Sequence, residues 1–178
     1  MHADPDKGPD FFICFSGQLF YLYSECQTWE AQMHSERETL IRAATEAMQK
    51  AYAPYSGFKV GAALLSQDGE FFTGCNIENR SYGLTICAER TAIFKAVSSG
   101  ITEFQLMIVI ADAPGPVIPC GACLQVIAEF NEKLPLICMN TRHSAVEYTL
   151  DNLLTHPFHP EQGNNIKDTF PREPKTSF

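Results

Sequence analysis

The stretch that most restricts the fold of this chain is residues 105–111, QLMIVIA, because it is apolar at every position except the first. A strand with one face in water alternates apolar and polar residues, whereas a continuously apolar strand is covered on both faces. Four other strand-like runs occur in the chain, at residues 59–65, 71–75, 135–140 and 145–149. The Asp68-Gly69 pair between the first two runs predicts an antiparallel hairpin.

Three segments have the pattern of helices. Ser35 and Glu38 match a capping box, so we expect a helix to begin there and to end at Pro54. A second helix is predicted to open at Cys87 and to stop at Gly100. Apolar residues at helical spacing mark a third helix: Cys123, Val126, Ile127 and Phe130. A hairpin followed by helices and strands in alternation predicts an α/β sandwich with a mixed sheet.

The chain is acidic, with 13 Lys and Arg against 21 Asp and Glu and a net charge of −8. This balance disfavours binding to a nucleic-acid backbone, which usually requires a basic stripe. Residues 1–34 hold five acids and one base, however, and so contribute −4 of the charge. The rest of the chain is only mildly acidic, and charge alone is a weak argument against nucleic acid.

The two ends of the chain differ in composition from the middle. Residues 1–34 show neither a helical nor an alternating period, so we expect an N-terminal extension outside the core fold, with Met33 as a candidate natural start. Residues 35–161 form the expected core domain, and residues 162–178 a polar tail. The apolar run at residues 11–23 is too short to span a bilayer and lacks the basic flank and cleavage site of a signal peptide. We therefore expect a cytoplasmic protein.

Seven cysteines, an odd and high number, argue against a closed disulfide framework. The informative ones lie in Cys87-Ala88-Glu89 and in Pro119-Cys120-Gly121-Ala122-Cys123, and each segment opens a predicted helix. A helix N-terminus carries partial positive charge and free N–H groups, which favour a thiolate. Cys120 and Cys123 lie within one helical turn, and Cys87 can supply a third sulfur from the neighbouring helix.

Three thiolates suit zinc and leave its fourth position for water, which is the pattern of a catalytic site. Bound zinc lowers the pKa of that water and yields hydroxide near neutral pH. Glu89 lies two residues beyond Cys87 and is placed to shuttle a proton beside the metal without binding it. Three thiolates give the zinc cluster one net negative charge, and we expect Arg90 to offset it by donating hydrogen bonds to the sulfurs.

Two other interpretations of the cysteines remain open. A Cys-x-x-Cys pair also occurs in dithiol redox proteins, although there it lies beside a different strand pattern. A structural zinc site would require a fourth ligand, for which Cys138 and His143 are available. The two cysteine segments together, about thirty residues apart and both at helix starts, match the zinc-deaminase signature of a ligand-x-Glu followed by Pro-Cys-x-x-Cys.

Over residues 35–161 the chain resembles the small zinc-dependent cytidine deaminase family. The resemblance is carried by residues 53–64 (APYSGFKVGAAL), 74–79 (GCNIEN), 87–92 (CAERTA), 119–123 (PCGAC) and 151–154 (DNLL) with Phe158. It implies a three-layer α/β/α sandwich with a five-stranded mixed β-sheet, and a catalytic domain over residues 35–161. It also implies hydrolytic deamination of cytidine and 2′-deoxycytidine to the uridine products and ammonia, in pyrimidine salvage.

The resemblance assigns the chemistry to the two cysteine segments. Cys87, Cys120 and Cys123 would bind one zinc ion per subunit. Glu89 would first protonate N3 of the pyrimidine and then pass the water proton to the departing amine.

The resemblance assigns substrate contacts to other segments. Asn76 and Glu78 would hydrogen-bond the ribose hydroxyls, and their spacing places both on one face of a strand. Phe58 would pack against the base. In the family the site is completed by neighbouring subunits of a homotetramer, which would give Tyr82 and Phe158 contacts across subunits.

The sequence departs from the family at Leu124, where members commonly carry Arg. Since Leu124 lies off the predicted apolar face of its helix, we expect an exposed or interface leucine. The related blasticidin-S deaminases share the zinc segments but differ in the nucleoside segment, and the Cys-Asn-Ile-Glu-Asn run favours cytidine. Polynucleotide-editing deaminases generally use His as first ligand, so Cys87 argues against them. The expected partner is a small nucleoside, with neither nucleic acid nor membrane.

Overall fold

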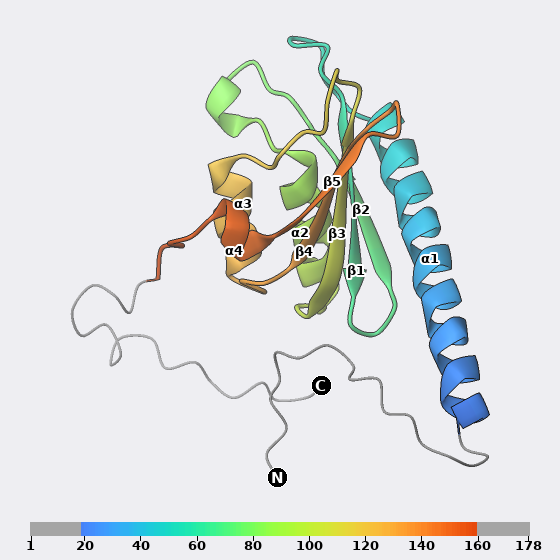
Figure 1. Cartoon of the computed structure of the whole chain (residues 1–178). Helices are drawn as coiled ribbons and strands as arrows, with labels where there is room; N and C mark the ends of the chain where they lie inside the picture. The colour runs from blue at the N-terminus through green and yellow to red at the C-terminus, as the bar shows by residue number, and fades with distance from the viewer. Residues whose placement is uncertain (1–18, 160–178) are drawn as a thin grey trace, which may run out of the picture. The chain divides into compact units, whose positions relative to one another are not determined.

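The computed structural model describes residues 19–159, with side chains from residue 34 onward. The chain divides into two compact units, Met1–Glu38 and Thr39–Phe178, and the sheet belongs to the second. Its strands are arranged in the order β2-β1-β3-β4-β5 (Figure 1). They are β1 (Val60–Ser66), β2 (Phe71–Cys75), β3 (Phe104–Ala111), β4 (Pro135–Asn140) and β5 (Ala145–Thr149). Each strand begins and ends within one residue of a predicted run, so the five-stranded sheet is confirmed.

The sheet is mixed, as expected. β1 pairs antiparallel with both β2 and β3, and β4 pairs antiparallel with β5. Only β3 and β4 are parallel. A parallel pair requires a crossover connection, and α3 (Gly121–Ala128) lies within it. The loop that leaves β3 therefore leads directly to the start of α3, where two of the cysteines lie.

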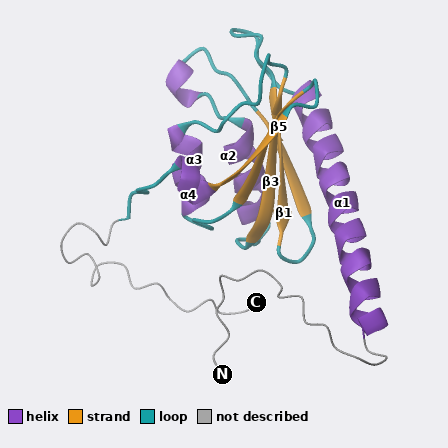
Figure 2. Cartoon of the chain, viewed as in Figure 1, coloured by secondary structure: helices purple, strands orange, loops and turns teal. Residues whose placement is uncertain are grey.

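Helices cover both faces of β3, which confirms the three-layer sandwich (Figure 2). Leu106, Ile108 and Ile110 pack in one buried cluster with residues of α1 from Thr39 onward. Met107 and Val109 point to the other face and pack in a cluster with residues of α2 (Ala88–Ser98) and α3. This alternation is what a period of two imposes on a strand between two layers.

Two glycines allow a strand to approach a helix backbone closely. A Cβ on Gly74 of β2 would lie 2.3 Å from the carbonyl oxygen of Ala88 and 2.4 Å from the amide nitrogen of Ala92 in α2. A Cβ on Gly61 of β1 would lie 2.0 Å from the carbonyl oxygen of Ala44 in α1. Gly74 thus lets β2 support the first turn of α2, which begins beside Cys87.

The prediction that the first helix begins at Ser35 is wrong. α1 extends from Leu19 to Gln49, so Ser35 and Glu38 lie inside the helix. A Ser with a Glu three residues later also occurs on one face within a helix, because positions i and i+3 are neighbours there. The prediction followed apolar periodicity, which is clear only from Leu40 onward, and it therefore missed the earlier turns.

The prediction for Leu124 is also wrong. Leu124 is 6% exposed and belongs to the buried cluster that includes α2 residues. The predicted apolar face counted Phe130, but α3 ends at Ala128. The buried positions of the observed helix are Cys123, Leu124, Ile127 and Ala128. Leucine at position 124 thus stabilises the core through apolar burial.

Two short elements were not predicted, the 3-10 turn η1 (Tyr82–Leu84) and the helix α4 (Leu150–Leu153). Among residues 19–159, none of the helices combines the length and apolar character that crossing a bilayer requires. The predicted extension (residues 1–34), the Met33 start and the tail (residues 162–178) lie mostly or wholly outside the part of the chain described with side chains. Those assignments remain predictions.

Candidate active site

Cys87 and Cys120 occupy equivalent positions, each as the N-cap residue of a helix. Both have extended backbone dihedrals, and in neither does the side chain make a capping hydrogen bond. Their carbonyl oxygens accept the first bonds of α2 and α3, from the N–H groups of Thr91 and Leu124 respectively. The two sulfur atoms are consequently left to other partners near the positive ends of two helix dipoles.

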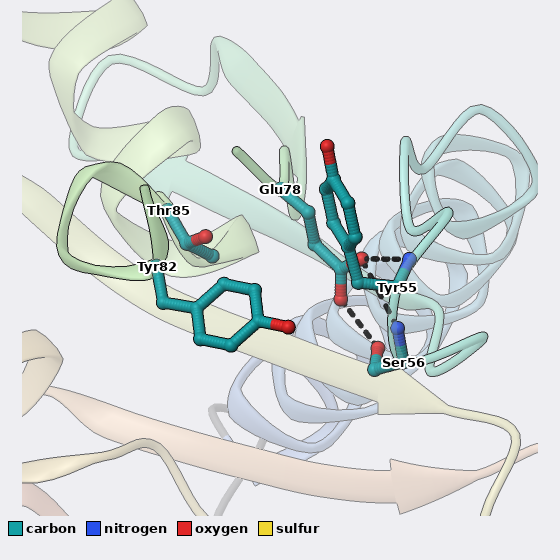
Figure 3. Close-up of a pocket in the computed structure, with 5 residues that line it drawn as sticks. All are labelled: Tyr55, Ser56, Glu78, Tyr82 and Thr85. Atoms are coloured by element: carbon teal, nitrogen blue, oxygen red, sulfur yellow. Dashed lines mark hydrogen bonds between the residues drawn. The ribbon is translucent and has the colours of Figure 1, made fainter. Parts of the chain in front are cut away.

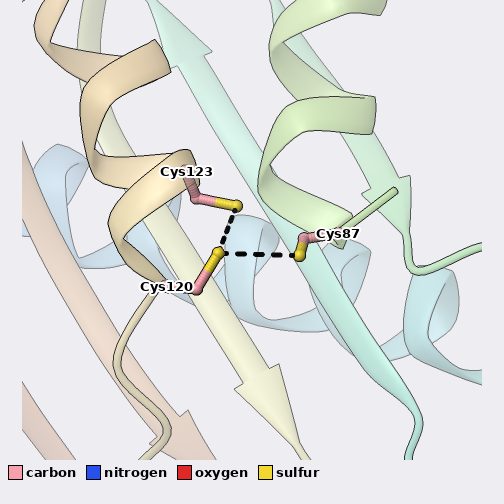
Figure 4. A group of neighbouring side chains, drawn as sticks. All are labelled: Cys87, Cys120 and Cys123. Atoms are coloured by element: carbon pink, nitrogen blue, oxygen red, sulfur yellow. Dashed lines mark hydrogen bonds between the residues drawn. The ribbon is translucent and has the colours of Figure 1, made fainter. Parts of the chain in front are cut away.

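The three sulfur atoms form one group (Figure 4). Cys87 Sγ lies 3.9 Å from Cys120 Sγ, which lies 3.5 Å from Cys123 Sγ. Zinc–sulfur bonds of about 2.3 Å in a tetrahedron place the sulfur atoms about 3.8 Å apart. Both sulfur–sulfur distances lie close to this value, and three thiolates are a donor set typical of zinc, so the residues fit the metal.

Among the residues that the structure describes, no fourth protein ligand joins the group. Cys138 and His143, which a structural zinc site could have used, are not members of the cluster formed by the described residues. Cys138 is buried on β4, and His143 lies in the turn between β4 and β5 with a φ of 64°. Three ligands are the pattern of a catalytic zinc site rather than a structural one.

Arg90 connects the cysteine group with the segment before it. Its Nη2 donates to Cys87 Sγ at 3.5 Å and to the carbonyl oxygen of Thr85 at 3.4 Å. Hydrogen bonding from Cys123 and from Arg90 holds the pKa of the Cys87 thiol far below its usual value, at about 5. The Nε atom of Arg90 is buried and has no hydrogen-bond acceptor within the described part of the chain. Arg90 therefore lies where a positive charge compensates the thiolates.

Glu89 lies in the first turn of α2 and is 4% exposed. Burial raises the pKa of its carboxyl group, and the negative charge of Cys87 raises it further. Glu89 does not belong to the three-cysteine group. A buried carboxyl group beside the three cysteines can both accept a proton and return it.

A cavity of about 380 Å³ is lined by Tyr55, Ser56, Glu78, Tyr82 and Thr85 (Figure 3). Thr85 lies two residues before Cys87, and its carbonyl oxygen accepts the bond from Arg90. The Tyr55 and Tyr82 rings meet edge to face, with centroids 6.0 Å apart. The cavity thus combines aromatic walls with one carboxylate, as small-molecule sites commonly do.

The Glu78 carboxylate is held by the chain segment opposite it. The backbone N–H groups of Tyr55 and Ser56 donate to Oε2 at 2.8 Å and 3.2 Å, and the Ser56 hydroxyl donates to Oε1. The hydrogen bond from the Ser56 hydroxyl is the main cause that lowers the pKa of Glu78, and the two backbone bonds lower it further. Glu78 is therefore an oriented, ionised acceptor in the cavity wall.

The side chain of Asn76 bonds to the backbone of the next residues along that segment, Phe58 and Val60. Its Nδ2 donates to the carbonyl oxygen of Phe58 at 2.8 Å, and its Oδ1 accepts from the N–H of Val60 at 2.9 Å. Asn76 is 8% exposed, whereas Phe58 is 40% exposed. Since β2 ends at Cys75, Asn76 and Glu78 follow the strand rather than lie within it. Nδ2 carries a second amide proton, which makes no hydrogen bond to the described residues and is open to a further acceptor.

Phe158 and Tyr82 are largely exposed, at 73% and 75%. Gln125 of α3 holds the backbone of Phe158 at both ends: its Nε2 donates to the Phe158 carbonyl oxygen at 3.0 Å, and its Oε1 accepts from the Phe158 N–H at 2.8 Å. Tyr82 lines the cavity, but Phe158 is not among the residues that line it. Within one chain the structure therefore brings Tyr82, and not Phe158, to the cavity.

Sequence reasoning missed Ser56, Thr85 and Gln125. Ser56 lies inside the APYSGF motif, but its role depends on a carboxylate 22 residues later. Gln125 follows the cysteine segment by two residues, but its partner lies 33 residues away. Only a motif shared with relatives could have drawn attention to them, because polar residues in loops carry no periodic signal.

The geometry of the site indicates a class of enzyme. Two helix starts converge on three thiols, and a buried acid lies beside them. Arg90 connects the thiols with Thr85, which lines a cavity that holds a single carboxylate. These are the features of a zinc-dependent hydrolytic enzyme.

Comparison with known proteins narrows the class to a family. The chain matches the family model of the cytidine and deoxycytidylate deaminase zinc-binding region over residues 34–139. A cytidine deaminase of Sporosarcina psychrophila is 52% identical over 125 residues, which cover 70% of this chain and 92% of that protein. One of Halalkalibacterium halodurans is 47% identical over 131 residues, which cover 73% of this chain and 99% of that protein.

A solved structure agrees with these sequence matches. The crystal structure of cytidine deaminase from Burkholderia pseudomallei is 47% identical, covers 68% of this chain and 98% of that chain, and has a TM-score of 0.66. The chain thus belongs to the family of zinc-dependent cytidine and deoxycytidylate deaminases.

Proposed function

We propose that this protein catalyses the hydrolytic deamination of cytidine and 2′-deoxycytidine to the uridine products and ammonia, in pyrimidine salvage. The observation that carries the proposal is the position of Glu89, buried in the first turn of α2 two residues beyond Cys87. The cytidine deaminases to which the chain is similar supply the substrate class.

Cys87, Cys120 and Cys123 hold the zinc ion, one per subunit, and Arg90 offsets the charge of the thiolates. The bound zinc supplies the Lewis acidity that lets water act as a nucleophile near neutral pH. Glu89 donates a proton to N3 of the base, and it then takes the proton of the attacking water and passes it to the departing amine. Burial raises the pKa of the Glu89 carboxyl group, which favours its protonated form as the proton donor.

The substrate is oriented by residues outside the cysteine segments. Glu78 accepts a hydrogen bond from a ribose hydroxyl, and the free amide proton of Asn76 serves the sugar as well. Phe58, which is exposed, packs against the base. These remote contacts supply binding energy that places the amine-bearing carbon at the metal centre.

We further propose a homotetramer, in which Phe158 contacts the substrate of a neighbouring subunit, and in which Tyr82 does so as well as lining the cavity of its own chain. Their large exposed fractions in the single chain support contacts of that kind. We assign the catalytic domain to residues 35–161, with residues 1–34 as an extension and residues 162–178 as a tail. A reducing cytoplasm suits a site made of three thiolates.

The test is the loss of cytidine absorbance with the purified full chain, with and without a zinc chelator. Deamination that stops on chelation and returns with zinc supports the proposal. Protein that retains zinc but leaves cytidine unchanged is a structural zinc protein instead. Activity that is independent of zinc and follows the redox state of Cys120 and Cys123 indicates a thiol oxidoreductase.

Glu89→Gln tests the proton shuttle. We expect a normal zinc content and fold but a kcat lower by about 10²–10⁴-fold, because the amide cannot carry the proton. Glu70→Gln, which changes an exposed acid between β1 and β2, is the matched control and should keep full activity. Near-normal turnover of Glu89→Gln with zinc bound would contradict the assigned role.

A further inference from the structure

Ser56 forms several hydrogen bonds around Glu78, and the zinc chemistry gives these bonds no role. Its hydroxyl donates to Glu78 Oε1 and accepts from the N–H of Phe58 at 3.0 Å. Its own N–H and that of Tyr55 donate to the other carboxylate oxygen, Oε2. Both oxygens of Glu78 are thus held from the same side, as Figure 3 shows.

These bonds limit what Glu78 can still accept. An ionised carboxylate offers about four acceptor sites. Three are taken by Tyr55 and Ser56, which leaves one for a ligand. Glu78 also lines the cavity, so the remaining site is available to a group bound there. The carboxylate is therefore equipped to accept a hydrogen bond from one hydroxyl rather than from two.

The Ser56 hydroxyl is not needed to close the turn in which it lies. The N–H of Gly57 donates to the carbonyl oxygen of Ala53 at 3.0 Å, a bond within the backbone. Gly57 has a φ of 68°, which a glycine adopts without strain. The backbone thus shapes the turn, and the Ser56 hydroxyl is left to act on Glu78 and on the Phe58 N–H.

We propose that Ser56 is a positioning residue that orients the Glu78 carboxylate toward the cavity, and that it thereby makes the enzyme selective for one of the two ribose hydroxyls of its substrate. The proposal rests on the proposed function, because it takes Glu78 as a ribose contact. Ser56 itself does not touch the reacting atoms. Its effect passes through the direction and ionisation of Glu78, so it should appear in substrate binding rather than in the chemical step.

The first test compares four substrates that differ only in the sugar: cytidine, 2′-deoxycytidine, 3′-deoxycytidine and 2′,3′-dideoxycytidine. We expect Ser56→Ala to lower kcat/KM for cytidine about tenfold, mainly through KM, because a hydrogen bond to a charged group is lost. The loss should disappear for 2′,3′-dideoxycytidine. It should also disappear for one monodeoxy substrate and persist for the other, since Glu78 serves one hydroxyl.

Matched variants separate positioning from structure. Ser56→Thr keeps the hydroxyl and should keep the selectivity of the unmodified protein. Ser56→Cys keeps the side-chain volume but offers only a weak donor, so it should resemble Ser56→Ala. The cysteine variant also provides the test if the alanine variant does not fold. Ser98→Ala removes another exposed hydroxyl, which donates to the carbonyl oxygen of Lys95 within α2, and should change nothing. In a Glu78→Gln background, Ser56→Ala should have little further effect on KM.

The failures can be told apart. If the wild-type protein with zinc does not deaminate cytidine, the proposed function fails. If it does, but Ser56→Ala lowers kcat/KM equally for all four substrates, Ser56 supports the turn alone and the inference is overturned. An unchanged kcat/KM for cytidine in Ser56→Ala overturns it as well.

Discussion

The two halves of the site are held together in different ways. In the metal half, Cys87 and Cys120 are placed by helix starts, and the bonds that fix them are the first backbone bonds of α2 and α3. The sugar half is the part that we propose to bind the ribose, formed by Tyr55, Ser56, Asn76 and Glu78. Its parts are joined by bonds between side chains and loop backbone, such as the bond from the Tyr55 N–H to Glu78. The positions of the residues in the metal half thus depend on local helix geometry, whereas those in the sugar half depend on contacts between loops that are distant in sequence.

This difference predicts how each half fails. A change in the metal half should remove chemistry while the sugar half keeps its structure. A change in the sugar half should weaken binding while zinc remains. Arg90 is the exception, because one of its nitrogen atoms bonds both to Cys87 and to Thr85 in the cavity wall.

The largest effect is expected from Cys120→Ala, which removes one of three zinc ligands. Zinc content should fall below one per chain and deamination should be lost, because two thiolates from different helices do not make a complete site. The amide resonances of Tyr55 and Ser56 should keep their positions, since their bonds to Glu78 do not involve the cysteines.

Cys75→Ala is the matched control, because Cys75 is a half-buried thiol on β2 outside the zinc group. It should retain zinc and activity. Equal zinc loss in both variants would mean that the chain binds metal through thiols in general rather than through this cluster.

A smaller effect is expected from Arg90→Gln, which tests the connection between the halves. The loss of the guanidinium leaves the thiolates uncompensated, and zinc affinity should fall about 10–100-fold. KM for cytidine should rise at saturating zinc, because the Thr85 carbonyl oxygen loses its partner. Competition with a zinc chelator measures the first effect and steady-state kinetics the second. A lower zinc affinity with an unchanged KM would contradict the connection and would mean that Arg90 acts on the metal half alone.

The same difference explains what the sequence could predict. Two short segments contain the metal half of the site, with Cys87 and Glu89 in one and Cys120 and Cys123 in the other. Within each segment the residues lie two or three positions apart, so helical spacing alone predicts that their side chains lie close together. The strands were predicted to within one residue, because apolar runs have a period that burial imposes. The role of Ser56 could not be predicted from spacing, since it depends on a hydrogen bond between residues 22 positions apart.

The errors had a common cause in the limits of local patterns. Ser35 and Glu38 match a capping box wherever they occur, and only the neighbouring turns show that the helix continues through them. Leu124 was assigned to the wrong face because Phe130 was counted as helical, and the end of α3 at Ala128 moves the apolar face by one residue. Both errors concern where a helix begins or ends.

The smallest effect is expected from acid, and it falls on the sugar half alone. Hydrogen bonds, first of all that from the Ser56 hydroxyl, lower the pKa of Glu78 below its ordinary 4.5 in the folded protein. A carboxyl group with a lowered pKa contributes stability that is fully present above pH 4.5 and is lost as the pH falls through the lowered value. The backbone bonds of Tyr55 and Ser56 to Glu78 should weaken in that window.

NMR titration of these two amide resonances should therefore give a shared midpoint below 4.5, and Ser56→Ala should move the midpoint of the Tyr55 amide upward. A midpoint at or above 4.5 in the unmodified protein would mean that the turn does not hold Glu78 in its ionised form, and that the sugar half is organised by other contacts.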